Sequence, residues 1–480
     1  MRRNFASKET IEVLIANSQK AISDFEHMLH NVEFIKSKLC NKGLSINYCQ
    51  LVFELLSGNL LVLYEMCIDL KCMLSTSNVY VKRFHMQMIN LSQYEWCKYL
   101  VGRDQGGVMP KIINHLKELH KETKELESIL QQLRLLGQKC DTGLRNITAH
   151  YDDPNTMYSM LVTLNDEDIY AKRVGDQLLI HDMILKYLSL FLQAISQTLS
   201  IGDIANVKKR ISYKLNVQNI VNNKVAKDFN DKESLDVITE DQIADAWNNI
   251  ESYKRMLNTC EKIIAFFKSK KLDYTRFIEI KSVVEMQMAV SFMQYDLACS
   301  MNTYLKASSN AERSISFMRA YRIETNALSH LYGYNEKYRE KSIWNKIRIV
   351  PEFKFIPLSN EIEDELIALT SHLDSTKRNL YTHYRENIKL NISERWQCAN
   401  EIDHPRELMQ MLRLVTLCKN INQFLVILIS SISSTEKQKN DEMLKPITKI
   451  KKLASQNNQQ EIVEMSDKLL SMFSLSNEKL

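Results

Sequence analysis

Apolar residues recur at intervals of three and four along most of the chain. In 51–74 the recurring positions are Leu51, Leu55, Leu56, Leu60, Leu63, Met66, Cys67 and Leu70. In 111–136 they are Ile112, Ile113, Leu116, Leu119, Leu126, Ile129, Leu130 and Leu133, amid lysine and glutamate. This spacing places side chains on one face of a helix, so we expect helices in both segments. The segment 156–182 is compatible with a small hairpin or with a pair of helices.

The two longest uncharged runs cover 187–202 and 420–435, sixteen residues each. Both are shorter than the ~20 residues that cross a bilayer. Both are also rich in serine, glutamine or asparagine. We therefore expect two buried core helices and no membrane partner.

Similar segments recur along the chain at an offset of 231–233 residues. The segment RNITAHY at 145–151 matches RNLYTHY at 378–384, and the two uncharged runs are separated by the same 233 residues. Glu54 corresponds to Glu285 and Glu65 to Asp296, both at 231. The common order and near-constant offset indicate an internal duplication. We expect an all-α protein of two tandem helical bundles related by a pseudo-two-fold.

The duplication divides the chain into four parts. The first bundle is assigned to residues 1–204 and the second to 250–437. A polar connector at 205–249 separates them, and it carries a basic cluster that includes Lys208, Lys209 and Arg210. Residues 438–480 are expected to form a helical tail.

Composition narrows the class of protein further. The chain has only 10 glycines and 6 prolines among 480 residues, which argues against sandwiches, barrels and doubly wound sheets. It has no Gly-rich phosphate loop and no GxSxG turn. The net charge of +5 is too small to identify a nucleic-acid binder. Ten scattered cysteines without a CxxC pair, and an N-terminus without an apolar core, predict a cytoplasmic protein with reduced thiols.

The sequence RNxxxHY is the most similar stretch between the two copies. Chance predicts about 0.5 occurrences of Arg-x4-His in a chain of this composition, yet the pattern occurs twice at equivalent positions. On a helix, Asn146 and His150 are four residues apart and share a face, and Arg145 lies about 100° to the side of them. Histidine titrates near neutral pH and serves as acid or base. The arginine fork binds phosphate oxygens.

These motifs resemble those of the HEPN superfamily, small helical bundles marked by an arginine, a polar residue and a histidine. The resemblance covers both repeats, although only the motifs match residue by residue. Many members are metal-independent endoribonucleases whose two motifs meet in one cleft, and they occur in toxin–antitoxin and antiphage systems. The resemblance therefore implies a tandem HEPN-like protein in which one chain forms a pseudo-dimer.

The residues that we assign to catalysis are Arg145, Asn146, His150, Arg378, Asn379 and His383. The histidines would act as acid and base, the arginines would stabilise the phosphorane, and the asparagines would orient them. The carboxylates Glu54, Glu65, Glu285 and Asp296 are candidates for holding the arginines, or are surface charges. Candidate RNA contacts are Tyr151, Tyr384, Lys208, Lys209 and Arg210. Each tyrosine would stack on a base, or would pack the end of its helix.

The expected function is an endoribonuclease, a toxin or antiphage defence effector. It would cut tRNA or mRNA by attack of the 2′-OH, without a metal or other cofactor. A regulatory or sensor protein encoded elsewhere, and self-association into a homo-oligomer, are compatible with this hypothesis. The alternative is a non-catalytic helical scaffold that binds RNA, a nucleotide or a protein partner. The scaffold would bind through the same cleft. Each motif also has a purely structural interpretation, in which its asparagine caps a helix or hydrogen-bonds locally, its histidine is semi-buried and its arginine pairs with a carboxylate.

Overall fold

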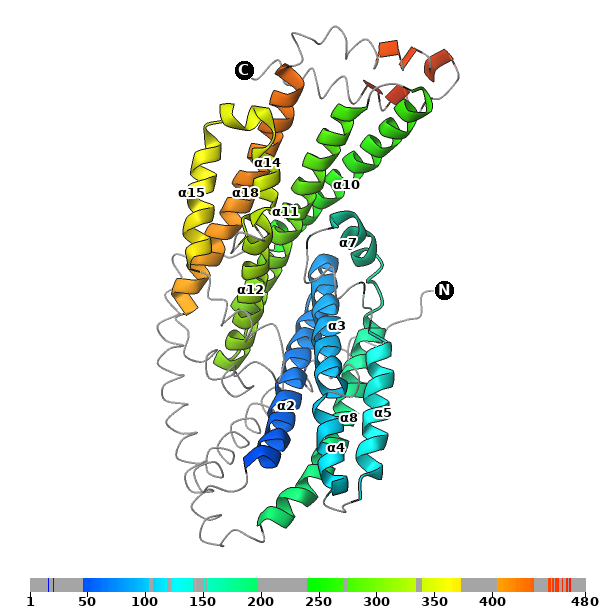
Figure 1. The fold of residues 1–480 in the computed structure, drawn as a ribbon, viewed down its shortest axis with the longest axis vertical. Helices are drawn as coiled ribbons and strands as arrows, with labels where there is room; N and C mark the ends of the chain where they lie inside the picture. The colour runs from blue at the N-terminus through cyan, green and yellow to red at the C-terminus, as the bar shows by residue number, and fades with distance from the viewer. Residues whose placement is uncertain are drawn as a thin grey trace.

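The fold of the protein was obtained as a computed structural model. It describes residues 46–102, 107–118, 122–140, 153–196, 240–271, 274–333, 339–372 and 404–435, together with isolated positions such as Tyr151 and several between 448 and 467. Within these ranges the chain forms helices and no strands (Figure 1). The predicted all-α class is confirmed.

The first half of the chain contributes six described helices. They are α2 (Ile46–Ser75), α3 (Val79–Val101), α4 (Val108–Glu118), α5 (Lys124–Gln138), α7 (Pro154–Leu161) and α8 (Glu167–Ser196). Asn78 caps α3, since its side-chain oxygen accepts hydrogen bonds from the backbone N–H groups of Tyr80 and Val81. Gly102 ends the same helix at a φ of 74°, a conformation that favours glycine.

The second half contributes the remaining seven. They are α10 (Glu240–Ser269), α11 (Thr275–Leu305), α12 (Asn310–Leu331), α14 (Ile343–Arg348), the 3₁₀ helix η1 (Pro351–Phe355), α15 (Leu358–Ser371) and α18 (His404–Thr435). Ser309 caps α12 by accepting from the N–H of Glu312. Gly333 follows α12 at a φ of 81°, as Gly102 follows α3.

Several predicted elements differ in detail from the structure. The periodic segment 111–136 is divided between α4 and α5, and the ambiguous segment 156–182 is a helix pair, α7 and the first part of α8. Helix α10 begins at Glu240, so the boundary placed at 250 falls inside a helix. Apolar spacing identifies a helical face but does not locate helix ends, which accounts for these differences.

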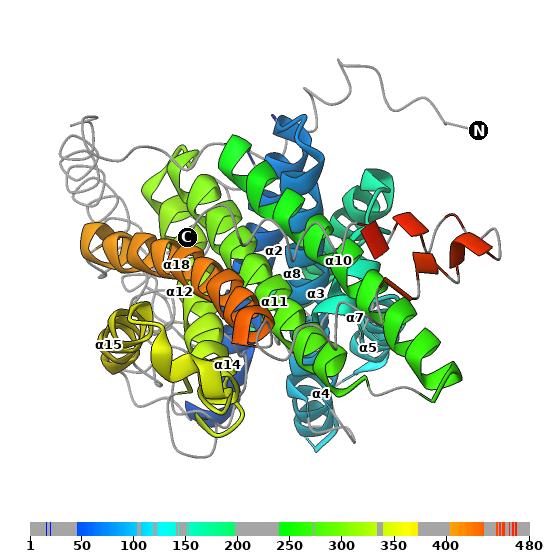
Figure 2. The same cartoon turned by 90° about the horizontal axis from the view of Figure 1, so that it is seen from above.

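One large hydrophobic core runs through both halves of the molecule, and a small separate cluster joins Ile263, Phe267 and Phe277. Trp247 on α10 lies at the junction, where it stacks on Tyr80 of α3 at 5.4 Å between ring centroids. Its ring also meets Phe292 and Tyr295 of α11 edge-on. Figure 2 shows α10 and α11 running side by side between the α3–α7 group and the α12–α18 group. The two halves therefore share one apolar interior.

Among the described residues, one helical segment, Leu408–Ser431 in α18, is long and apolar enough to cross a membrane. Half of its most apolar stretch is buried against the rest of the protein. Phe424, Leu425 and Leu428 contribute that buried face. Seven described cysteines are free thiols, and burial raises the pKa of the Cys67 thiol to about 12.

Candidate functional site at the junction of the two halves

Most residues of the two predicted motifs lie outside the described residues. This applies to Arg145, Asn146, His150, Arg378, Asn379, His383 and Tyr384, and to Lys208, Lys209 and Arg210. Glu54 lies within α2, but its side chain is not among those described. The catalytic assignments therefore stay predictions. The described candidates are Tyr151, Glu65, Glu285 and Asp296.

Tyr151, the residue after His150, makes a contact between the two halves. Its side-chain O–H donates a hydrogen bond of 3.0 Å to Oδ2 of Asp296 on α11. Its ring meets the ring of His330 on α12 edge-on, at 6.0 Å between centroids. Tyr151 is 2% exposed and Asp296 is 1% exposed. The chain that leaves the first motif is thus fixed to two helices of the second half.

The burial of Tyr151 decides between its two candidate roles, stacking on a base and packing within the protein. A ring that is 2% exposed presents no free face on which a base could stack. In this structure the side chain of Tyr151 is packed in the interior and donates a hydrogen bond. This agrees with the alternative role, in which the tyrosine packs instead of stacking on a base. We therefore remove Tyr151 from the candidate RNA contacts.

Asp296 is a buried carboxyl with an altered proton affinity. Burial raises the pKa of Asp296 to about 7, and this shift is opposed by the hydrogen bond from Tyr151 and by the charge of Arg322. Its second oxygen, Oδ1, accepts no hydrogen bond from the residues that the structure describes. Asp296 therefore changes charge near neutral pH and keeps one acceptor open.

A second buried group of polar side chains joins α2, α3, α11 and α12. Asp69 Oδ1 lies 2.9 Å from Nδ1 of His85 and accepts a hydrogen bond from Nη1 of Arg319. Nε2 of His85 lies 3.4 Å from Oγ1 of Thr303 on α11. All four residues are buried. We call Asp69, His85, Thr303 and Arg319 the Asp69 cluster.

Glu65 borders the Asp69 cluster, one helical turn before Asp69. Its backbone carbonyl accepts a 2.8 Å hydrogen bond from Nη2 of Arg319. Its side-chain Oε2 accepts from the hydroxyl of Ser92 at 3.3 Å. Glu65 and Asp296, which correspond in the predicted repeats, are thus both buried at the junction. Glu285 differs, because its carboxylate pairs with Lys281 one turn away at a partly exposed position.

None of the four residues of the Asp69 cluster was predicted from the sequence. Asp69 lies four residues after Glu65 within a run that is otherwise apolar, and Arg319 and Arg322 lie three apart within the mostly apolar stretch 315–323. Charged residues on apolar faces are rarely buried unless they are paired. A charged residue within an apolar stretch is therefore the sequence feature that could have pointed to this cluster. It indicates burial but does not identify the partner, which lies 250 residues away for Asp69 and Arg319.

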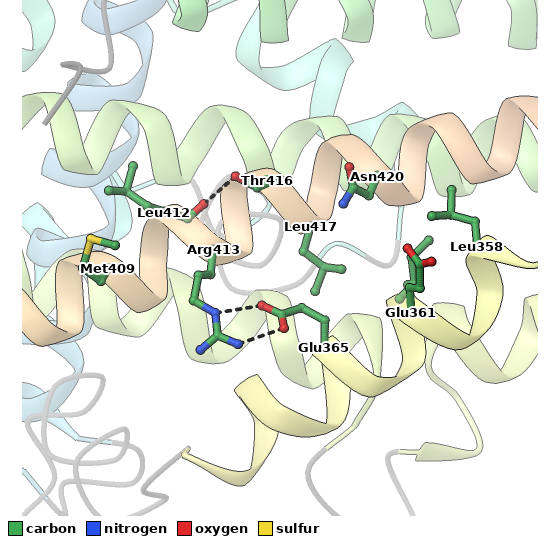
Figure 3. A pocket seen from close by; sticks show the side chains of 10 residues that line it. Leu358, Glu361, Glu365, Met409, Leu412, Arg413, Thr416, Leu417 and Asn420 are labelled. Atoms are coloured by element: carbon green, nitrogen blue, oxygen red, sulfur yellow. Dashed lines mark hydrogen bonds and ion pairs between the residues drawn. The ribbon is translucent and has the colours of Figure 1, made fainter. Parts of the chain in front are cut away.

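A groove lies between α15 and α18, and the Asp69 cluster contributes no residue to its described lining (Figure 3). Its volume is about 310 Å³, and its apolar lining includes Ile362, Leu412 and Leu417. Arg413 spans the groove and forms a two-pronged ion pair with Glu365, at 2.9 and 2.8 Å. Of the described candidates, none of Tyr151, Glu65, Glu285 and Asp296 is among the described residues that line this groove. Its apolar walls fit contact with another molecule better than proton transfer.

Acid–base side chains from both halves meet at the junction. The part of the chain that the structure describes contains no group of three or more His, Cys, Asp or Glu side chains that could hold a metal ion. The junction instead brings together carboxylates, arginines and histidines from both halves. Such a set can hold and move protons, and it can orient neighbouring side chains.

Comparisons with known proteins returned no match. Models of protein families, curated proteins and solved structures were each searched with the whole chain, and none matched.

Proposed function

We propose that the protein is a metal-independent HEPN-type endoribonuclease with two tandem HEPN-like bundles. The observation that carries the proposal is the repeated Arg-Asn-x3-His-Tyr motif at 145–151 and 378–384. The contact between Tyr151 and Asp296 supports it, because it ties the chain beside the first motif to the second half. A composite site requires such an attachment.

The packing of the helices supports the tandem duplication. In the first half, α2 packs on α3 and α8, α3 packs on α5 and α8, and α5 packs on α8. In the second half, α11, α12, α15 and α18 repeat these five pairings in the same order. The lengths also agree: 30 and 31 residues for α2 and α11, 23 and 22 for α3 and α12, 15 and 14 for α5 and α15, and 30 and 32 for α8 and α18.

The proposed chemistry uses one histidine from each motif. One of His150 and His383 takes the proton of the 2′-OH, and the other protonates the departing 5′-oxygen. Arg145 and Arg378 bind the phosphate and stabilise the charge that develops on it. Attack by the neighbouring hydroxyl leaves a 2′,3′-cyclic phosphate on one product and a free 5′-OH on the other.

The buried carboxylates have a supporting role in this proposal. Oδ1 of Asp296 accepts no hydrogen bond within the described part of the chain, so it offers an acceptor to an arginine of a motif. Glu65, at the corresponding position, is also buried. A fixed arginine loses less freedom when it binds phosphate.

The biological role that fits this activity is a toxin or an antiphage defence effector that acts in the cytoplasm on tRNA or mRNA. An RNase of this kind harms the cell that makes it. We therefore propose control by a regulatory or sensor protein encoded elsewhere. The two bundles form an intramolecular pseudo-dimer, and further self-association is compatible with the site.

The test is the chemistry of the product ends. Purified protein is incubated with total cellular RNA in EDTA, and the new ends are examined with a 3′-phosphatase-deficient and a proficient polynucleotide kinase. The proposal predicts cleavage that persists in EDTA and yields cyclic-phosphate and 5′-OH ends. Cleavage that EDTA abolishes, or that leaves 5′-phosphates, would contradict it.

The groove between α15 and α18 favours the alternative, a non-catalytic scaffold that binds a partner. Its apolar walls and the exposed Met409 at its rim are typical of contact surfaces. A scaffold would bind RNA or a protein equally well after both motif histidines are replaced. A His150→Ala/His383→Ala variant that keeps every measurable function of the wild type would therefore favour the scaffold.

A further inference from the structure

The contact between Tyr151 and Asp296 joins residues 145 positions apart in the sequence. Tyr151 directly follows His150, so whatever holds Tyr151 also limits where the histidine can lie. The tyrosine hydroxyl donates to Asp296, and the tyrosine ring packs on His330. Both partners belong to the second half, and the tyrosine is almost fully buried. No other described residue lies so close in sequence to either motif histidine.

We infer that Tyr151 and Asp296 are positioning residues of the proposed nuclease, and that their hydrogen bond holds the end of the first motif against the second half. This inference rests on the proposed function for its catalytic consequence. The holding role itself rests on the contact alone. Neither residue touches the reacting atoms in this account, because both act through the placement of His150.

The surroundings of Asp296 make this contact dependent on pH. The titratable or charged groups that face it or its tyrosine partner come from three helices: Tyr295 and Cys299 on α11, Arg322 and His330 on α12, and Cys418 on α18. Burial raises the pKa values of Tyr295, Cys299 and Cys418, which keeps those three groups neutral at neutral pH.

The carboxyl of Asp296 changes charge close to pH 7, since burial raises its pKa to about 7. An ionised carboxylate accepts a stronger hydrogen bond from a hydroxyl than a neutral carboxyl does. The hydrogen bond between Tyr151 and Asp296 therefore becomes stronger as the pH rises from 6 to 8. It loosens when Asp296 takes up a proton.

Two variants and a matched control test the inference. Tyr151→Phe removes the donor, and Asp296→Asn keeps an acceptor but removes the charge. Tyr295→Phe is the control, because Tyr295 is equally buried, and its hydroxyl donates a 2.6 Å hydrogen bond to the carbonyl of Tyr80 in the other half. The control thus removes a similar bond between the halves without touching the chain beside a motif.

The first readout is hydrogen exchange of the peptide that contains 145–151, expressed as protection factors at pH 6 and pH 8. Wild type and Tyr295→Phe should show higher protection at pH 8. Tyr151→Phe and Asp296→Asn should show lower protection that no longer changes with pH. Unchanged protection in these two variants would overturn the holding role, whether or not the protein cleaves RNA.

The second readout is the rate of RNA cleavage in EDTA. A displaced histidine lowers kcat more than KM, since a misplacement of about 1 Å can reduce a rate on the order of 100-fold. We expect kcat to fall about tenfold in Tyr151→Phe and less in Asp296→Asn, with KM nearly constant. Equal losses in Tyr295→Phe would show general destabilisation and would overturn the inference.

The two readouts separate this inference from the proposed function. If the wild type cleaves RNA but Tyr151→Phe cleaves equally fast, the positioning role is wrong and the nuclease stands. If the wild type cleaves no RNA, the nuclease is wrong, and the protection factors alone decide whether Tyr151 and Asp296 hold this segment.

Discussion

At the scale of single residues, the molecule is defined by charged side chains that lie inside it. Asp296 and Asp69 are both buried, and each is held by partners from the other half of the chain. Burial of an ionisable group links folding to pH, because the folded and unfolded chains bind different numbers of protons. Asp296 is the clearest case, since burial raises its pKa from the ordinary aspartate value of 3.8 to about 7.

The first prediction concerns Asp296→Asn. Between about pH 4 and pH 7 the folded chain keeps a proton on Asp296 that the unfolded chain has already released, so this residue lowers the stability as the pH rises to about 7, and the loss is complete above that pH. The asparagine variant should therefore gain roughly 2–3 kcal/mol relative to the wild type between pH 5 and pH 8. Urea unfolding at the two pH values measures this difference.

The control for this prediction is Tyr295→Phe, which removes a buried hydroxyl that does not titrate in this range. Its effect on the free energy of unfolding should be the same at pH 5 and pH 8. A pH-independent effect of Asp296→Asn would mean that the carboxyl is not neutral at pH 5 to 7 in the folded protein.

The residue scale is also where the sequence was least informative. Glu65 and Asp296 are candidates because they correspond in the two predicted repeats, and both lie at the junction. His85, Thr303 and Arg319 were not, since a single charged or polar residue in a helix is read as a surface position. Only the packing of α2, α3, α11 and α12 brings these side chains together, and periodicity carries no information about which helices pack.

Between helices, buried hydrogen bonds and ion pairs connect elements that belong to different halves. Arg319 on α12 donates to the Asp69 side chain and to the Glu65 carbonyl, both on α2. Lys71 near the end of α2 pairs with Glu312 near the start of α12 at 2.9 Å. Two ion pairs at different depths thus fix these helices, which belong to different halves. The buried one is the more sensitive to loss of a partner.

The second prediction concerns Arg319→Met. Removal of the guanidinium leaves the fully buried Asp69 with His85 as its remaining ionisable partner, and an uncompensated buried charge costs about 3–5 kcal/mol. Urea unfolding should show a loss of this size. The additional change Asp69→Leu should restore part of it, because it removes the charge that was left without a partner.

Arg413→Met is the matched control, since Arg413 also forms an ion pair between two helices. Its pair with Glu365 is 40% and 30% exposed, and exposed pairs contribute about 0–1 kcal/mol. If Arg413→Met costs as much stability as Arg319→Met, burial does not explain the importance of the Asp69 cluster.

Helix positions could be predicted from the sequence much better than helix ends. The apolar positions of 51–74 lie within α2, and the uncharged run at 420–435 lies within α18. The boundary at 250 was wrong, because a drop in apolar content before it looked like a connector. Ile243, Ala246 and Trp247 are nevertheless buried on α10. These three apolar residues lie in an acidic segment and are too few to predict a helix there by their spacing.

At the scale of the whole molecule, the two halves share one core. Trp247 contacts α3, α7 and α11 through Tyr80, Tyr158 and Tyr295. A domain that folds alone has its own core, with few contacts across its boundary. The continuous core therefore makes each half dependent on the other, which suits a site that needs both motifs.

The third prediction is that the protein unfolds in a single transition. Tryptophan fluorescence reports on the interior, and far-ultraviolet circular dichroism reports on all helices, so the two curves should coincide in urea. Trp247→Phe should shift both midpoints together to a lower urea concentration. Two separate transitions would show that the halves are independent domains.

The composite site is tested most sharply by gel-resolved cleavage of total cellular RNA in EDTA, compared among four proteins: the wild type, His150→Ala, His383→Ala and the double variant. A composite site predicts cleavage by the wild type and loss of about 100-fold or more in each single variant, since general acid and general base each contribute 10²–10⁴-fold. The double variant should be no worse than either single variant. Full activity in one single variant would contradict a site that needs both motifs, and an inactive wild type would contradict the nuclease itself.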